Sequence, residues 1–271
     1  MSDTTRKSYV DGSFGQIHVR TAGKPSDKPP LVCLHQSPKN GLEFEDFMLA
    51  AADDRLVVAA DYPGYGMSDC PPSEQDATIE NYARAMWQVS DALKLSKVDV
   101  FGNHTGAKVA VEMAHQRPDN VRCIAMVSAA ILTDDERAQF VDYFKPIPLD
   151  KEGSRIIENW RRIVATASPD WTLEKMDRSF LQTCMGGEAY EWGHAAAFAY
   201  TTPFTDGLRD LPHRKVLLNP GDTLQDYTRR AAPIMTNGEV VECPEWSYGF
   251  LDMHSHAVSA LLKEKIDAEP A

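Results

Sequence analysis

Residues 98–114 read VDVFGNHTGAKVAVEMA, and this stretch does most to decide the fold. Its first four residues form a short, mostly apolar run typical of a buried strand, and residues 105–117 have the small and helix-forming side chains of a helix. Between them lies the turn Gly102–Gly106, with His104 at its centre. The flanking glycines indicate a sharp turn, because a Cβ at those positions would clash with the neighbouring strand and helix. We therefore expect His104 to project above the end of a buried strand.

Strand-like and helix-like segments alternate on both sides of this turn. Short apolar runs predict further strands at residues 31–35, 56–60, 121–128, 215–219 and 239–243, and weak alternation predicts a hairpin at 8–22. The spacing of apolar side chains predicts helices at residues 42–52, 78–94, 224–236 and about 254–267. Strands that alternate with helices imply a mostly parallel central sheet with helices on both faces. The predicted fold class is therefore α/β.

The alternation breaks between residues 133 and 205, which contain no clear strand. A chain of 271 residues is long enough to bury one large core that carries an insertion. We expect residues 1–132 and 206–271 to form the core, and residues 133–205 to form a helical cap. The side chains that we expect to form an aromatic lid within the cap are Trp160, Trp171, Tyr190, Trp192 and His194.

The composition limits the partners and the compartment. The net charge is −12, from 28 Lys and Arg against 40 Asp and Glu, so the surface repels nucleic-acid backbones and anionic lipids, and we expect neither as a partner. Five scattered cysteines without CxxC spacing favour a reducing compartment. Residues 1–9 are polar and no apolar run has the length of a membrane span, so we expect a cytoplasmic protein. An exposed edge of the sheet could pair with a second copy of the chain, so the sequence leaves the question of a homodimer open.

Four short motifs stand at the ends of predicted strands. They are HQSP at residues 35–38, DYPGYGMSD at 61–69, GNHTG at 102–106 and NPGD at 219–222. In this order they resemble the α/β-hydrolase family, from about residue 14 to about residue 267. The resemblance implies an oxyanion loop at the first motif, a nucleophile elbow at the third and the catalytic acid in the fourth.

Two positions depart from the pattern of that family. The elbow carries His104 where most members carry Ser, Asp or Cys, and Tyr248 stands where the base histidine is usual. Asp222 occupies the place of the acid. Gln36 replaces the usual glycine of the oxyanion loop, which is tolerable because a backbone N–H does the work. The Ser-His-Asp mechanism of the family therefore cannot be transferred to this chain unchanged.

Three hypotheses for His104 are open on the sequence alone. As a nucleophile, its neutral imidazole would attack a carbonyl carbon and form an acyl-imidazole that water hydrolyses. As a general base, it would reach Asp222 and form a dyad that activates water or removes a proton from an acidic C–H or O–H. In both cases the N–H groups of Gln36 and Thr105 would hold the oxyanion. In the third hypothesis, catalysis has been lost and the fold binds a small molecule.

Two further side chains are candidates near the usual base position. Tyr248 has a phenol whose ordinary pKa is near ~10, so we expect it to donate a hydrogen bond to the substrate or to Asp222, or simply to pack. His256 is an alternative base if the loop before the last helix takes a different path.

The resemblance thus implies an enzyme that needs neither cofactor nor metal and acts on a small, partly apolar, carbonyl-containing substrate beneath the cap. Hydrolysis is the first expectation. A lyase or isomerase reaction through a His104–Asp222 dyad is the alternative, and an inactive binding protein is the third.

Overall fold

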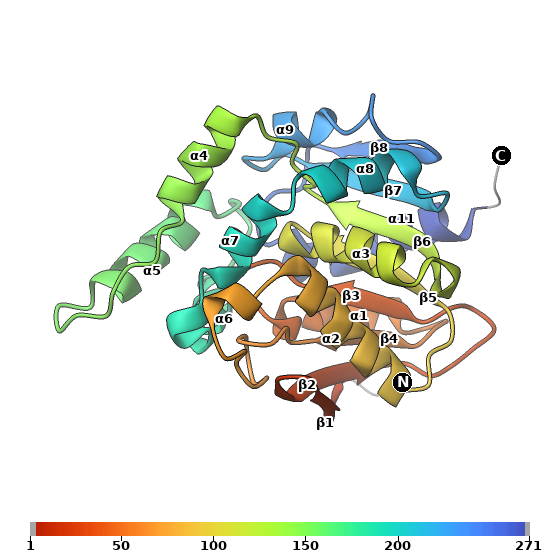
Figure 1. Ribbon diagram of the computed structural model, residues 1–271, viewed down its shortest axis with the longest axis horizontal. Helices are drawn as coiled ribbons and strands as arrows, with labels where there is room; N and C mark the ends of the chain where they lie inside the picture. Colours follow the sequence, from red (N-terminus) through yellow and green to blue (C-terminus); the bar gives the residue numbers. More distant parts are fainter. Residues whose placement is uncertain (1–3, 269–271) are drawn as a thin grey trace.

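The computed structural model describes residues 4–268, which form one eight-stranded sheet with the order β1-β2-β4-β3-β5-β6-β7-β8 (Figure 1). The pairs β1–β2 and β2–β4 are antiparallel, and all other neighbours are parallel. The strands are β1 Arg6–Gly12, β2 Gly15–Ala22, β3 Leu31–Leu34, β4 Val57–Ala60, β5 Val98–Asn103, β6 Val121–Val127, β7 Arg214–Pro220 and β8 Gly238–Cys243. The predicted mostly parallel sheet is confirmed. Residues 1–3 and 269–271 of the expected core lie outside the described residues.

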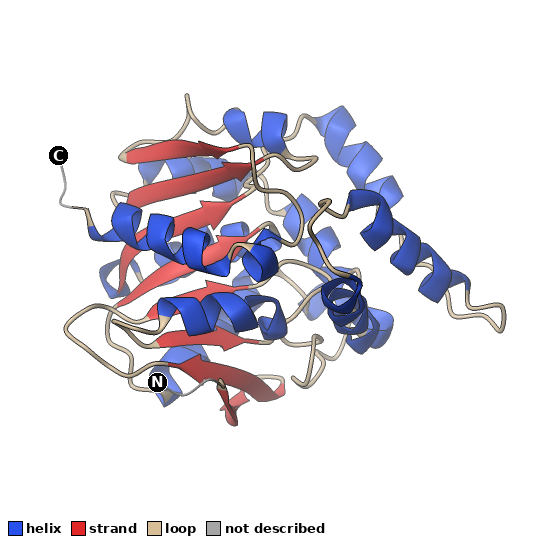
Figure 2. Ribbon diagram, turned by 180° about the vertical axis from the view of Figure 1, so that it is seen from behind, coloured by secondary structure: helices blue, strands red, loops and turns tan. Residues whose placement is uncertain are grey.

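Helices cover both faces of the sheet (Figure 2). On one face α2 (Ile79–Ala92) and α8 (Thr202–Asp210) pack on either side of α3 (Thr105–Gln116). On the other face α1 (Glu45–Ala51) packs against α11 (Ser255–Asp267). Four short 3₁₀ turns complete the core and the connections: Gly41–Phe44, Glu74–Asp76, Pro118–Asn120 and Gly187–Ala189.

Neighbouring residues of β5 contribute to both layers of the core. Val100 belongs to the apolar cluster under α2 and α3, whereas Phe101 packs on the rings of Phe44 and Phe47 beside α1. A parallel strand that is buried on both faces needs apolar side chains on both, which explains its mostly apolar sequence. Because β5 is fixed from both sides, the residues of the turn that follows it are held in place as well.

One predicted helix is much shorter in the structure. The helix expected over residues 224–236 is reduced to α9, Gln225–Arg229, and turns follow it. Pro233 has no N–H for the Arg229 carbonyl and its ring would clash with the preceding turn, so the helix cannot continue. The predicted last helix is preceded by a separate short helix, α10 (Phe250–Met253), which begins after Gly249 at φ 86°.

The cap lies over the carboxyl ends of the parallel strands (Figure 1). It contains α4 Asp134–Tyr143, α5 Ser154–Thr166, α6 Leu173–Met185 and α7 Trp192–Ala199. Thr133 and Glu136 start α4 with a capping box, in which each side chain accepts from the other residue's backbone N–H. α8 already packs on the core helix α3, so the chain returns to the core at about residue 202.

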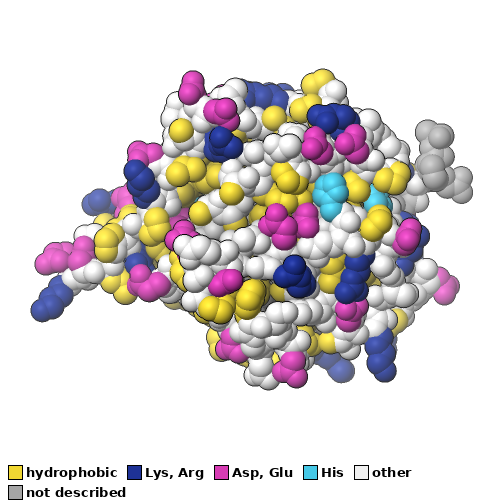
Figure 3. Space-filling model, in the orientation of Figure 1, with side chains coloured by type: hydrophobic (Ala, Val, Ile, Leu, Met, Phe, Trp, Pro, Cys, Tyr) yellow, Lys and Arg dark blue, Asp and Glu magenta, His cyan; other side chains and the backbone are white. Residues whose placement is uncertain are grey.

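The helices α4 and α5 project from the body of the molecule (Figure 1). None of the α4 residues is buried, and six apolar side chains of this region are exposed: Val141, Tyr143, Leu149, Ile156, Ile157 and Val164. Basic and acidic side chains are interspersed on the face seen in Figure 3. Within residues 4–268 no helix has both the length and the apolar character needed to cross a membrane.

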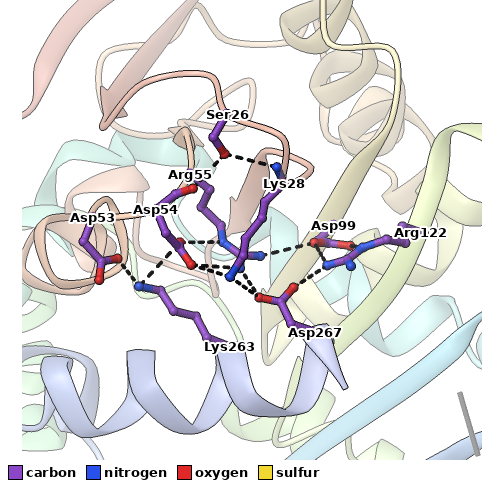
Figure 4. Close-up of polar contacts among 9 residues, drawn as sticks. All are labelled: Ser26, Lys28, Asp53, Asp54, Arg55, Asp99, Arg122, Lys263 and Asp267. Carbon is purple, nitrogen blue, oxygen red and sulfur yellow. Dashed lines mark hydrogen bonds and ion pairs between the residues drawn. The ribbon is translucent and has the colours of Figure 1, made fainter. Parts of the chain in front are cut away.

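A network of charged side chains joins distant segments at the amino ends of the parallel strands (Figure 4). The fully buried side chain of Arg55 contacts Asp54, Asp99 and Asp267. Arg122 also contacts Asp99 and Asp267. The network thus joins the loop before β4, the starts of β5 and β6 and the end of α11. It lies at the edge of the sheet opposite to the carboxyl end of β5.

Candidate active site

His104 occupies a strained turn between β5 and α3. Its backbone has φ 47° and ψ −107°, a conformation that residues other than glycine rarely adopt. A Cβ on Gly102 would lie 2.1 Å from the carbonyl oxygen of Gly106, and a Cβ on Gly106 would lie 1.9 Å from that of Leu34. Both glycines are therefore required for this turn to form. Strain of this kind is characteristic of functional sites, where the surrounding structure maintains it.

The imidazole of His104 faces the carboxylate of Asp222. Nε2 lies 3.3 Å from Asp222 Oδ2, and the two side chains are 17% and 3% exposed. Asp222 lies two residues after the end of β7, where the sequence motif predicted the acid. Burial raises the pKa of its carboxyl, but the contact with His104 and the hydrogen bonds of Ser128 and Leu224 outweigh burial and hold that pKa below its ordinary value. Asp222 is therefore placed to remain ionised and to orient the imidazole.

Ser128 supports Asp222 from the neighbouring strand, a role that the sequence analysis did not assign. It follows β6 with φ 51°, and its hydroxyl donates to Asp222 Oδ2, while the N–H of Leu224 donates to Oδ1 at 2.8 Å. Two strained residues on adjacent strands, His104 and Ser128, thus converge on one carboxylate.

A cavity of about 530 Å³ opens above this pair, between the core and the cap. His104 and Asp222 line its floor, and aromatic side chains line much of its wall: Phe140, Phe144, Trp171, Tyr227, Tyr248 and Phe250. A cavity of this size with mainly apolar walls and a few polar groups is typical of a small-molecule site. Of the residues predicted to form an aromatic lid, Trp171 and His194 line the cavity, whereas Trp160, Tyr190 and Trp192 do not.

Tyr248 lies beside His104, with 5.9 Å between the ring centroids. Its hydroxyl is 2.7 Å from the Thr223 hydroxyl, and burial raises the pKa of the phenol to about 12. Tyr248 can therefore donate a hydrogen bond but cannot serve as a base near neutral pH. His256 is exposed on α11 and does not line the cavity, so the alternative that it replaces the missing base is wrong.

The oxyanion loop differs from the sequence prediction at Gln36. The backbone N–H of Gln36 donates to Glu43 Oε2 at 3.1 Å, so it is already engaged and not free to bind an oxyanion. The backbone N–H of Ser37 is engaged as well, since it donates to Thr105 Oγ1 at 3.4 Å. Thr105 is the first residue of α3, so its own N–H has no acceptor within the helix. Of the predicted oxyanion donors, Thr105 is therefore the one whose N–H is not engaged by a partner within the helix.

Glu43 is a cavity-lining carboxyl that the sequence analysis missed. It is only 8% exposed and accepts hydrogen bonds from the backbone and side-chain amides of Gln36 and from the side-chain amide of Asn103. Burial is the dominant influence and raises the pKa of Glu43 to about 7. The apolar spacing that predicted a helix at residues 42–52 did not indicate that this glutamate would point inward.

Lys39 connects the loop after β3 to the cap. Its Nζ donates to the Ser179 carbonyl at 2.7 Å and to Thr183 Oγ1 at 2.9 Å, both in α6. The side chain is buried, and burial lowers the pKa of its ammonium group to about 8. This buried lysine fixes one wall of the cavity to the loop that supplies Ser37.

The cap contributes a polar cluster of its own to the cavity. His194 stacks on Phe144, with 4.0 Å between the ring centroids, and its Nδ1 contacts the buried carboxylate of Glu191. Arg162 Nη1 lies 3.9 Å from the same carboxylate. In the described part of the chain, no cluster of three or more His, Cys, Asp or Glu side chains is arranged to hold a metal ion.

Known protein sequences match about half of the chain. The sequence model of the family described as alpha/beta hydrolase fold matches residues 29–155. Haloalkane dehalogenase 2 from Mycobacterium bovis is 30% identical over 118 residues, which are 44% of this chain and 40% of the dehalogenase. A proline iminopeptidase from Lactobacillus acidophilus is 25% identical over 146 residues, which are 51% of this chain and 49% of the iminopeptidase. The chain thus spans less than half the length of these two relatives.

Solved structures match nearly the whole chain. An epoxide hydrolase from Vigna radiata has a TM-score of 0.79 at 16% identity and covers 97% of this chain and 98% of its own. An esterase from Exiguobacterium antarcticum has a TM-score of 0.76 at 18% identity and covers 97% of this chain and 100% of its own. At these identities the similarity establishes the fold.

Proposed function

We propose that this chain, which has the α/β-hydrolase fold, is an enzyme that hydrolyses a small, partly apolar, carbonyl-containing compound. In this proposal the His104–Asp222 dyad is the general base, and no cofactor is needed. The observation that carries the proposal is the distance of 3.3 Å between His104 Nε2 and Asp222 Oδ2 at the floor of the cavity.

The dyad supports a base role for the following reason. With Nε2 turned toward Asp222, the lone pair of the neutral ring lies on Nδ1, which has no hydrogen-bond partner within residues 4–268. Nδ1 would take a proton from water, and Asp222 would stabilise the imidazolium that forms. The hydroxide would attack the carbonyl carbon while the N–H group of Thr105 binds the oxygen. The imidazolium would then return the proton to the leaving group.

A nucleophilic role of His104 is less well supported by the same geometry. After acyl transfer, the acylated ring could no longer act as a base for the water that must hydrolyse it. Tyr248 cannot replace it, because burial raises the pKa of its phenol to about 12. The second histidine of the cavity, His194, belongs to the cap and is bound to Glu191.

The test is a kinetic comparison on a panel of aryl esters, alkyl esters and lactones. We expect His104→Ala to lower kcat/KM about 10²-fold or more, as for loss of a general base. His256→Ala is the matched control, since it removes an exposed imidazole from outside the cavity, and it should leave kcat/KM within about twofold. Full activity in His104→Ala would refute both catalytic roles of His104.

A second measurement separates the base from the nucleophile. Acid quenching during turnover followed by mass spectrometry would detect an acyl group on the peptide that contains His104. We expect no adduct and no pre-steady-state burst. A burst with an acylated His104 would replace the base mechanism by the nucleophilic one.

A further inference from the structure

Glu43 shares the cavity with His104, and the mechanism proposed above gives it no task. It follows the oxyanion loop in the 3₁₀ turn Gly41–Phe44, so its carboxyl lies beside the amides that approach the elbow. Carboxylic acids are almost never fully buried unless they are paired. No ion pair involves Glu43 among the described residues.

The hydrogen bonds of Glu43 leave one of its oxygens incompletely used. Oε1 accepts from both Gln36 Nε2 and Asn103 Nδ2, whereas Oε2 accepts, among the described residues, only from the Gln36 backbone N–H. A carboxyl oxygen has two positions for hydrogen bonds, so Oε2 has room for a proton or a further donor. Close by, Asn103 Oδ1 is a buried acceptor without a partner in the described part of the chain. Both atoms belong to residues that line the cavity.

The groups around Glu43 differ in their effect on its protonation. Lys39 and His104 favour the ionised carboxylate, and the buried Cys33 and Tyr62 also lie within electrostatic range of it. Burial outweighs these charges and raises the pKa of Glu43 to about 7. A carboxyl with this pKa can both donate and accept a proton near neutral pH.

We propose that Glu43 is a second acid–base group of the site, which exchanges a proton with the carbonyl oxygen of an enolisable aryl ketone while His104 exchanges one with the adjacent carbon. The proposal rests on the proposed function in two respects, since it needs a carbonyl group in the cavity and His104 as a base. It goes beyond that function because it assigns the substrate to the enolisable ketones and adds proton transfer at carbon.

The proton transfer balances without any further reactant. His104 removes a proton from the carbon next to the carbonyl group, and the C–H electron pair forms the C=C bond of an enol. The electron pair of the carbonyl π bond moves to oxygen, and this oxygen takes up the proton of Glu43. Glu43 is left as a carboxylate beside the enol hydroxyl. In the reverse direction the imidazolium protonates carbon and the Glu43 carboxylate recovers the hydroxyl proton. The aromatic walls formed by Phe140, Phe144 and Tyr227 suit the aryl group of such a ketone.

The experiment measures deuterium exchange of acetophenone methyl protons in D₂O by NMR, with the full chain. We expect the wild type to exchange them at least tenfold faster than buffer, and Glu43→Gln to lose at least tenfold of the catalysed kcat with little change in KM. Glu43→Asp keeps the acid and should recover part of the rate. Glu45→Gln is the matched control, since Glu45 lies outside the cavity with Arg20 and Thr5, and it should match the wild type.

The outcomes distinguish this proposal from the proposed function. Ester or lactone hydrolysis that depends on His104, without exchange of acetophenone protons, would overturn the role of Glu43 and leave the dyad intact. Exchange that is lost in His104→Ala but unchanged in a folded Glu43→Gln would also overturn it. Absence of both hydrolysis and proton exchange in the wild type would refute the two proposals together.

Discussion

The stability of the protein should depend on pH through Glu43, and Glu43→Gln should remove this dependence. The pKa of Glu43 rises from its ordinary value of 4.5 to about 7 because the carboxyl is buried. Between these two values the folded state holds a proton that the unfolded chain has released. The stability that this group contributes is therefore complete below pH 4.5 and is lost as the pH rises through about 7.

The size of the effect follows from the two pKa values. The pKa of Glu43 rises from 4.5 to about 7, and each unit of that rise corresponds to about 1.4 kcal/mol. The contribution to the free energy of unfolding is therefore about 3 kcal/mol. Glutamine keeps an acceptor for the Gln36 N–H but has no proton to lose. The free energy of unfolding of Glu43→Gln minus that of the wild type should therefore rise by about 3 kcal/mol from pH 4.5 to 7.5.

Urea denaturation at half-unit pH steps measures this difference. Subtraction of the two curves removes the titration of groups common to both proteins. Burial lowers the pKa of Lys39 to about 8, so the pH range stops below that value. Glu45→Gln, measured in the same way, shows the effect of losing a carboxyl outside the cavity. A difference curve for Glu43→Gln that is flat, or that falls with pH, would refute the assignment of Glu43 as a buried acid that keeps its proton.

Three further predictions concern the dyad and the network. Asp222→Asn should lower kcat/KM by about 10²–10⁴-fold, since the amide cannot stabilise the imidazolium, and steady-state kinetics would show it; unchanged kinetics would remove Asp222 from the mechanism. Ser128→Ala removes a hydrogen-bond donor from the ionised Asp222, so the pKa of that carboxyl should rise. The acid limb of the pH profile of kcat/KM should therefore move to higher pH, and a shift to lower pH would contradict the effect of this hydrogen bond. Arg55→Ala leaves Asp99 buried without this partner and should destabilise the fold by about 3–5 kcal/mol in urea denaturation, while kcat stays within about twofold; a large loss of kcat in the folded variant would couple the network to the site.

The sequence predicted the features that depend on local pattern. Residues 98–114 were sufficient for the strand, the turn and the helix, because the glycines and apolar side chains there are dictated by backbone clashes and burial. The position of Asp222 followed from the motif after β7. The shortened α9 was missed because Pro233 stands near the end of an otherwise helical pattern.

The residues that the sequence did not reveal act through contacts between distant segments. Ser128 needs the neighbouring β7 to reach Asp222, and Glu43 needs the oxyanion loop and Asn103 to be drawn inward. Glutamate at a helix start normally faces solvent, so no local pattern distinguishes Glu43. Similarly, the Gln36 N–H is engaged because it meets Glu43, and a motif alone does not contain that information.

The anchoring of the elbow has a consequence for how the enzyme could diversify. The N–H of His104 donates to the Val127 carbonyl at 3.0 Å, and Ser128, the next residue, holds Asp222. His104 and Asp222 are therefore tethered to the ladder of the sheet itself, and none of these bonds passes through the cap. Evolution, or a designer who exchanges α4 and α5 for other helices, can reshape the walls of the cavity while the His104–Asp222 pair keeps its geometry.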